Sequence, residues 1–211
     1  MSWTKDLSVE RKMDIIFYIL LIITLPFKLM NSEYDKVFSI ILTFFTVILT
    51  SIVFSKIKIK MPTQVYFIVL VFIFLSMYLG KVINFYRFFP RWDKFLHLIS
   101  GPILTLMGYI IFLNLINKKV YKGINPVLGI LFGVFFSIAC AGGWEIFEFT
   151  SDHLFGTNAQ NNSLLDTMGD IICGTIGGTI MGILMYLPLR GKNVPFFKKM
   201  MIDLEETIVK K

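Results

Sequence analysis

Charged residues are scarce in this chain of 211 residues. Asp, Glu, Lys and Arg make up 17% of it, whereas soluble globular domains contain about 25%. Hydrophobic residues make up 55% and include 22 phenylalanines. They occur in runs of about 18 or more, a length typical of membrane spans. The composition therefore excludes an ordinary soluble domain and predicts an all-α, polytopic membrane protein.

Several familiar site patterns are also missing from the chain. Its two cysteines, Cys140 and Cys173, fall inside apolar segments and form no C-x-x-C pair, so a disulfide framework is not indicated. The motifs H-E-x-x-H and G-x-S-x-G, which mark zinc proteases and serine hydrolases, do not occur. No reaction class therefore follows from a motif.

The hydrophobic residues form six predicted membrane spans. Each span is about 18–24 residues long, enough to cross a hydrocarbon core of about 30 Å as a helix. The segments lack the alternation of barrel strands, so helices are expected. The spans are residues 13–30, 37–54, 64–83, 95–116, 126–148 and 165–188. We expect one six-helix transmembrane domain over residues 1–188 and a cytoplasmic tail over residues 189–211.

The basic residues, which give a net charge of +7, lie mainly in the loops and the tail. If the N-terminus is cytoplasmic, 15 of the 21 Lys and Arg residues lie on the cytoplasmic side. By the positive-inside rule this bias predicts that both termini are cytoplasmic. No basic stripe with interleaved aromatics covers a soluble face. We therefore expect the lipid bilayer, and not nucleic acid, to be the partner.

The tail carries an amphipathic pattern. Its apolar residues recur at helical spacing, lysines and acids take the opposite face, and Pro195 suits the first turn of a helix. The apolar residues are Phe196, Phe197, Met200, Met201, Leu204 and Ile208. The pattern predicts an amphipathic helix on the cytoplasmic membrane surface, with a partly disordered tail as the alternative.

Three pairs of ionisable residues stand at the ends of the last three spans. The pairs are Asp93 and His97, Glu145 and Glu148, and Asp166 and Asp170. Separations of three or four residues place both members of a pair on one helix face. In the predicted topology span four begins, span five ends and span six begins on the outer side. All six side chains are therefore expected at one depth near the external interface, where they form one site.

The segment between the last two spans is polar. His153 and "GTNAQNN" (residues 156–162) contain many turn-forming residues. We expect them to form a solvated external loop, with a lid over the site as the alternative.

Small residues follow the same helix faces below the ionisable pairs. Gly174, Gly178 and Gly182 form a G-x-x-x-G-x-x-x-G pattern in the last span, and Gly101 lies below His97. Small residues at this spacing let helix backbones approach closely in lipid. Spans four to six are therefore predicted to form a tight inner bundle, capped by the acidic residues.

Five carboxylates this close together must be neutralised. Arg87, Arg91 and Lys94 can form salt bridges with them, the carboxylates can share protons, or a divalent metal ion can be bound. Oxygen ligands favour Mg, Ca or Mn, and the one histidine in these pairs, His97, admits Zn or Fe. An ionisable residue within a membrane span marks a functional site by default, with a purely structural salt-bridge network as the alternative.

The same motifs carry a resemblance to known families. The segments "WDKFLHLISG" (92–101), "WEIFEF" (144–149) and the D-x-x-x-D of Asp166 and Asp170 resemble the YjdF-like family of bacterial inner-membrane proteins. More distantly, the chain is similar to the VanZ-like proteins, whose motifs follow in the same order. The match covers about residues 90 to 182. It implies a multi-pass protein of the bacterial cytoplasmic membrane with a shared polar site, and it supplies no substrate.

Three functions are consistent with the sequence. The first is a divalent-cation site that acts on an anionic outer-leaflet lipid or an envelope precursor. Asp93, His97 and the glutamate pair would be its ligands, with Asp170 as a base or further ligand. The second is a transporter or proton-coupled carrier whose carboxylates titrate. The third is a structural membrane protein in which the acids form a salt-bridge cluster. The sequence leaves the oligomeric state open.

Overall fold

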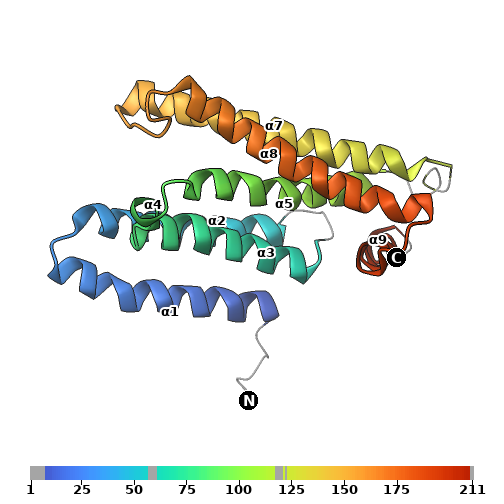
Figure 1. Cartoon of the computed structure of the whole chain (residues 1–211). Coiled ribbons are helices and arrows are strands. Elements are labelled where there is room, and N and C mark those ends of the chain that lie inside the picture. Colours follow the sequence, from blue (N-terminus) through green and yellow to red (C-terminus); the bar gives the residue numbers. More distant parts are fainter. Residues whose placement is uncertain (1–7, 57–60, 117–120, 122, 210–211) are drawn as a thin grey trace, which may run out of the picture. The chain divides into compact units, whose positions relative to one another are not determined.

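The structure is a computed structural model that describes residues 8–56, 61–116, 121 and 123–209. These residues form helices and contain no β-strand (Figure 1). Six helices in this part of the chain are long and apolar enough to cross a membrane. The predicted all-α, multi-span architecture is thereby confirmed.

The chain divides into two compact units, Met1–Trp92 and Asp93–Lys211. The first unit contains α1 (Val9–Met30), α2 (Tyr34–Lys56), α3 (Thr63–Ile73), the π-helix η1 (Phe74–Val82) and the short α4 (Phe85–Phe88). The second contains α5 (Trp92–Leu115), which begins at the boundary, α7 (Pro126–Phe155), α8 (Leu164–Tyr186), the 3-10 helix η2 (Leu187–Arg190) and α9 (Pro195–Ile208).

In the first unit, α1, α2 and α3 pack around an apolar core. Leu21 of α1, Val47 of α2 and Tyr66 of α3 are almost completely buried in it. The π-helix η1 continues α3, so that together they form one span from Thr63 to Val82. Its Tyr78 hydroxyl is 2.9 Å from the hydroxyl of Thr24 in α1, which adds a polar link to the apolar packing.

In the second unit, α5, α7 and α8 form a three-helix bundle, as the small residues predicted. Lys94 of α5 pairs with Asp166 of α8, and further along Thr105 of α5 donates a hydrogen bond of 3.2 Å to the Gly178 carbonyl. Residue numbers rise together along this contact, so α5 and α8 run in the same direction. Ser137 of α7 donates to the Gly101 carbonyl at 3.0 Å, and α7 runs opposite to both.

The backbones of α5 and α8 touch at glycines. A Cβ atom added at Gly101 would lie 2.8 Å from the carbonyl carbon of Gly177 and closer still to Gly174 and Gly178 backbone atoms. A Cβ atom at Gly177 would overlap the Leu98 carbonyl oxygen and lie 2.9 Å from Cδ of Pro102. Contacts this short leave no room for any side chain. The two helices are therefore held in one register along this seam.

The fifth membrane-spanning helix, α7, is longer than its predicted span. Helix α7 covers 30 residues and ends at Phe155, where Gly156 adopts a left-handed conformation (φ 65°) that closes the helix. The prediction ended this span at residue 148 because the apolar run stops there. The expectation that His153 lies in the loop is therefore wrong, since it occupies the last turn of α7.

The tail forms the predicted amphipathic helix. Pro195 is the first residue of α9, and Met201, Leu204 and Ile208 are buried on one side of the helix. A polar contact also holds α9 in place, since the Tyr109 hydroxyl of α5 donates a hydrogen bond of 3.3 Å to the Glu205 carboxylate.

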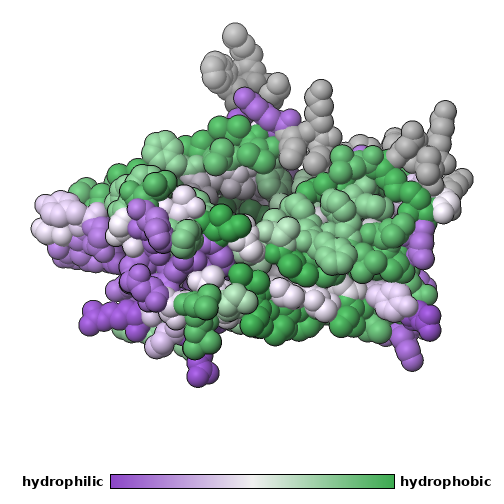
Figure 2. All heavy atoms as spheres, turned by 90° about the horizontal axis from the view of Figure 1, so that it is seen from above, coloured by the Kyte–Doolittle hydropathy of each residue, from purple (hydrophilic) through white to green (hydrophobic). Residues whose placement is uncertain are grey.

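The surface of the protein matches that of a membrane protein. On the face seen in Figure 2, hydrophobic residues cover much of the middle and hydrophilic residues gather toward the two ends. Exposed apolar side chains such as Phe135, Ile172 and Ile176 belong to the middle of their helices. In water they would form an unfavourable surface, whereas hydrocarbon accommodates them at no cost.

The glycine seam gives the first testable prediction. Gly177→Ala should lower the free energy of unfolding by about 1–3 kcal/mol, because the methyl group has no space between α5 and α8. Unfolding of the purified protein in mixed micelles of mild detergent and dodecyl sulfate measures the change.

Gly142→Ala is the matched control, since an added Cβ at this glycine of α7 has no neighbour within 4 Å. It should leave stability unchanged or raise it slightly, as alanine favours helices more than glycine does. Equal stability of the two variants would contradict the close α5–α8 contact.

Candidate metal site

Helix α5 places Asp93 and His97 one turn apart near its start. Asp93 lies in the first turn, where a carboxylate is favoured by the helix dipole. His97 is buried, with 8% of its surface exposed. The spacing of four residues directs both side chains to the same side of α5.

Helix α8 contributes Asp166 and Asp170 in the same way. Its N-cap is Ser163, whose hydroxyl accepts a hydrogen bond of 3.2 Å from the Asp166 backbone N–H. Lys94 of α5 joins the two acids, since its Nζ lies 2.6 Å from Asp166 Oδ1 and 2.8 Å from Asp170 Oδ2. Nζ also donates to the Asp166 carbonyl at 2.9 Å. One lysine thus fixes both carboxylates against α5.

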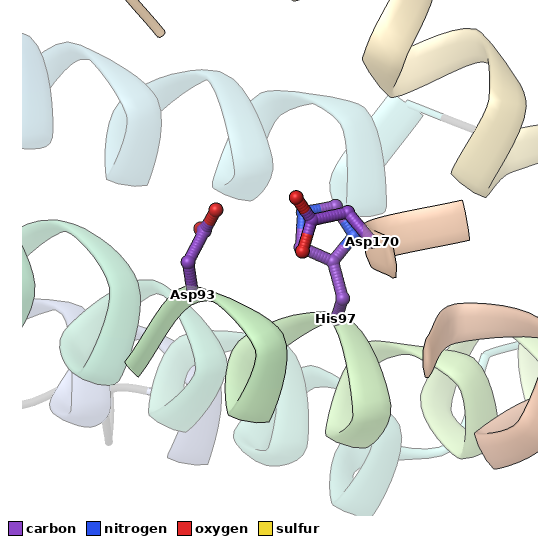
Figure 3. A group of neighbouring side chains, drawn as sticks. All are labelled: Asp93, His97 and Asp170. Atoms are coloured by element: carbon purple, nitrogen blue, oxygen red, sulfur yellow. The ribbon is translucent and has the colours of Figure 1, made fainter. Parts of the chain in front are cut away.

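Three potential metal ligands meet between α5 and α8. One ligand atom each from Asp93, His97 and Asp170 lies within 4.8 Å of the others. Figure 3 shows the two side chains of α5 and Asp170 of α8 directed into the same space. Asp170 is almost completely buried, with 2% of its surface exposed.

Helix α7 brings a further carboxylate to this group. Glu145 has 3% of its surface exposed, and its Oε1 lies 3.8 Å from Nε2 of His97. Glu148, three residues further on, is only partly buried and accepts a hydrogen bond of 2.9 Å from the Trp144 indole. It remains within electrostatic range of Asp93 and Glu145. The two glutamates are therefore not equivalent.

The loop between α7 and α8 is fastened over Glu145. Asp152 accepts hydrogen bonds from the Thr157 hydroxyl (2.5 Å) and from the backbone N–H groups of Ala159 (2.7 Å) and Gln160 (3.0 Å). The Gln160 side-chain amide then donates to both the carbonyl (3.1 Å) and Oε2 (3.2 Å) of Glu145. An exposed carboxylate of α7 thus orders the loop, and the loop in turn orients Glu145.

Two buried carboxylate oxygens in the site have no hydrogen-bond partner among the described residues: Oε1 of Glu145 and Oδ1 of Asp170. The other oxygen of each group is satisfied, by Gln160 and by Lys94 respectively. A buried, unsatisfied carboxylate oxygen costs about 1–3 kcal/mol or more. The site therefore holds acceptor atoms that this part of the chain does not use.

The structure brings the sequence-predicted residues together at one end of the bundle. Asp93, His97, Glu145, Asp166 and Asp170 are linked through the contacts above, and Glu148 lies at the edge. Of the three cations proposed as partners, Lys94 lies among the acids, whereas Arg87 and Arg91 belong to the first unit. Gln160 was not expected to contact the site, since its segment was predicted to form a solvated loop. A single amide in a polar loop gives no sequence signal for such a contact.

A second buried carboxylate, in the first unit, was also not anticipated. Asp14 of α1 is buried and accepts a hydrogen bond of 2.5 Å from the Tyr66 hydroxyl of α3. Nearby, the Thr63 hydroxyl donates to the Glu10 carboxylate. The first three spans were considered nearly featureless, and Asp14 stands alone in an apolar run, so nothing in the pattern indicated its partner.

The lysine contact gives the second testable prediction. Lys94→Met should lower the free energy of unfolding by about 3 kcal/mol, because it leaves the buried Asp170 carboxylate without its cation. Asp170→Asn introduced into the same variant should restore part of the loss, since the unpaired charge is removed. Unfolding in mixed micelles is measured for the wild type, Lys94→Met, Asp170→Asn and the double variant, which together form a double-mutant cycle.

Lys28→Met is the control for losing a lysine from an ion pair. Lys28 bridges Glu33 at 2.9 Å, and the Glu33 side chain is 36% exposed. Exposed pairs contribute about 0–1 kcal/mol, so this change should be nearly neutral. A Lys94 variant as stable as the Lys28 variant would contradict the role of Lys94.

Comparisons with known proteins place the chain in a family. The family described as "Predicted membrane protein (DUF2238)" matches residues 13–191. The chain is 31% identical over 123 residues to an uncharacterized protein of Thermotoga maritima. The aligned region spans 57% of this chain and 60% of that protein. No solved structure matches the chain significantly. Because the family match covers residues 13–191 of the 211, the chain belongs to the DUF2238 family of predicted membrane proteins.

Proposed function

We propose that this integral membrane protein binds a divalent cation through Asp93, His97, Asp170 and Glu145. One observation carries the proposal. Three ligand atoms lie within 4.8 Å of one another, and beside them two buried carboxylate oxygens have no hydrogen-bond partner among the described residues. A cation in this space would supply the missing partner for both oxygens.

The distances suit a metal ion. Ligands about 2.1 Å from a tetrahedral metal lie about 3.4 Å from one another. His97 Nε2 and Glu145 Oε1 are 3.8 Å apart, so a small closing movement would bring them to that spacing. Three carboxylates and one imidazole are hard-to-borderline ligands, which suit Mn, Fe or Zn as well as Mg.

The charge balance also favours a cation. The site contains five carboxylates, and among the described residues a lysine salt bridge reaches two of them, from Lys94 to Asp166 and Asp170. The other three are Asp93, Glu145 and Glu148. A salt-bridge cluster that served only to hold the helices together would be expected to pair each buried carboxylate with a cation. Asp166 is saturated by Lys94 and by the Asn161 amide at 2.8 Å, and Glu148 by Trp144. We therefore leave these two outside the ligand set.

The proposed location follows from topology. The bias of Lys and Arg supports a topology with both termini in the cytoplasm, in which the site lies at the outer interface of the membrane. The YjdF-like resemblance, which the family match is consistent with, supports the bacterial cytoplasmic membrane. A site at that depth meets outer-leaflet lipids and envelope precursors, the substrate class that we propose. A cation held there would polarise a substrate oxygen.

Metal analysis tests the proposal. The purified wild-type protein, equilibrated with Mn, Zn or Mg, should hold a single equivalent of divalent metal. His97→Ala and Asp170→Asn should lower the affinity by more than the roughly 10–100-fold that loss of an outer partner costs. Elemental analysis and calorimetric titration in mild detergent measure both quantities.

Glu148→Gln is the matched control, since Glu148 is three residues from Glu145 on the same helix. It should keep the metal, whereas Glu145→Gln should weaken binding. Wild-type protein without bound metal under these conditions would overturn the proposal, and substrate-dependent proton movement in proteoliposomes would then test the carrier function. Equal loss in the Glu145 and Glu148 variants would refute the ligand set.

A further inference from the structure

The junction of η2 and α9 carries an uncompensated positive charge. Residues 189–199 contain four cations and no acid. The cations are Arg190, Lys192, Lys198 and Lys199, and all four are exposed. No salt bridge joins any of them to an acid in the described parts of the chain. The charge is therefore available to an external partner.

Exposed apolar side chains lie among these cations. Phe196 is 71% exposed and Leu189 is 40% exposed. They do not belong to the buried side of α9, which Met201, Leu204 and Ile208 form against the bundle. Alternating cations and large apolar groups are typical of segments that rest on a lipid surface, where the charges meet headgroups and the apolar groups enter the acyl boundary.

The orientation of α9 fits such a surface. Figure 1 shows α9 nearly end-on at the end of α8, which itself runs along the page, so α9 lies across the direction of the span. A helix that crosses the end of a membrane-spanning helix in this way lies along the membrane surface. The turn between them uses Gly191 in a left-handed conformation (φ 72°) followed by Pro195.

Polar contacts fix α9 against the bundle. Glu205 accepts the hydrogen bond from Tyr109 and also interacts with Tyr121. Burial raises the pKa of the Tyr121 hydroxyl, and the Glu205 carboxylate raises it further, so that Tyr121 remains a neutral donor. With its inner side held in this way, α9 presents the cations in a constant position.

We infer that Arg190, Lys192, Lys198, Lys199 and Phe196 form a binding surface for anionic phospholipid headgroups in the leaflet where α8 ends. Clusters of four or more cations directly after a membrane span, or on an amphipathic helix, favour anionic lipids. The complementary charge selects the headgroup, and Phe196 adds contact with the acyl region. This surface is independent of the proposed cation site, which lies at the opposite end of α8.

Lipid retention tests the inference. The full-length protein, extracted into mild detergent with a chelator present, is mixed with equal amounts of phosphatidylglycerol and phosphatidylcholine, and bound lipids are counted by native mass spectrometry. The wild type should retain phosphatidylglycerol preferentially, and the preference should fall with added salt. Lys198→Gln and Lys199→Gln should each reduce it by about fivefold, and the double variant by more.

Arg87→Gln with Arg91→Gln is the matched control, because it removes two exposed cations from a different part of the chain. It should keep the preference. Phe196→Ser tests the apolar contribution without touching the buried side of α9, and should weaken retention of both lipids. Equal retention of the two lipids by the wild type, or the same loss in the control, would overturn the inference and favour an acidic protein partner for the patch.

Discussion

The close contact between the backbones of α5 and α8 determines where every other part of the second unit lies. Gly101 and Gly177 bring the two helices so near that no side chain fits between them at these positions. Because both helices run in the same direction, the contact places their first turns side by side. Asp93 and His97 then meet Asp170 directly, and Lys94 reaches two carboxylates at once. Backbone packing in the middle of the bundle thus determines which ionisable side chains meet at its end.

The acidic cluster combines two solutions to one electrostatic problem. On one side, Lys94 and Asn161 saturate Asp166, and this part resembles a structural salt bridge. On the other side, Glu145 and Asp170 keep one free buried oxygen each, next to His97. The loop adds rigidity, because Asp152 holds Gln160 and Gln160 holds Glu145. The salt-bridged part of the cluster, around Asp166, therefore supports the part in which Glu145 and Asp170 each keep a carboxylate oxygen without a hydrogen bond.

The sequence was sufficient for the spans and for the end of the bundle at which the acids meet, since hydropathy and helical spacing are local properties. It was not sufficient to predict that Lys94 pairs with both Asp166 and Asp170, because that contact depends on how α5 is rotated against α8. Hydropathy did not predict the extension of α7 to Phe155, because Thr150, Ser151 and Asp152 end the apolar run without ending the helix. The contacts of Gln160 and Asp14 could not be predicted from the sequence either, because each residue meets its partner only through tertiary packing.

The long sequence separation between Lys94 and its two acids has a consequence for biosynthesis. Asp166 and Asp170 follow the lysine by 72 and 76 residues, with α7 between them. Helix α5 is therefore translated well before the two acids that pair with its lysine. The cluster is therefore complete only once α8 has joined α5 in the membrane.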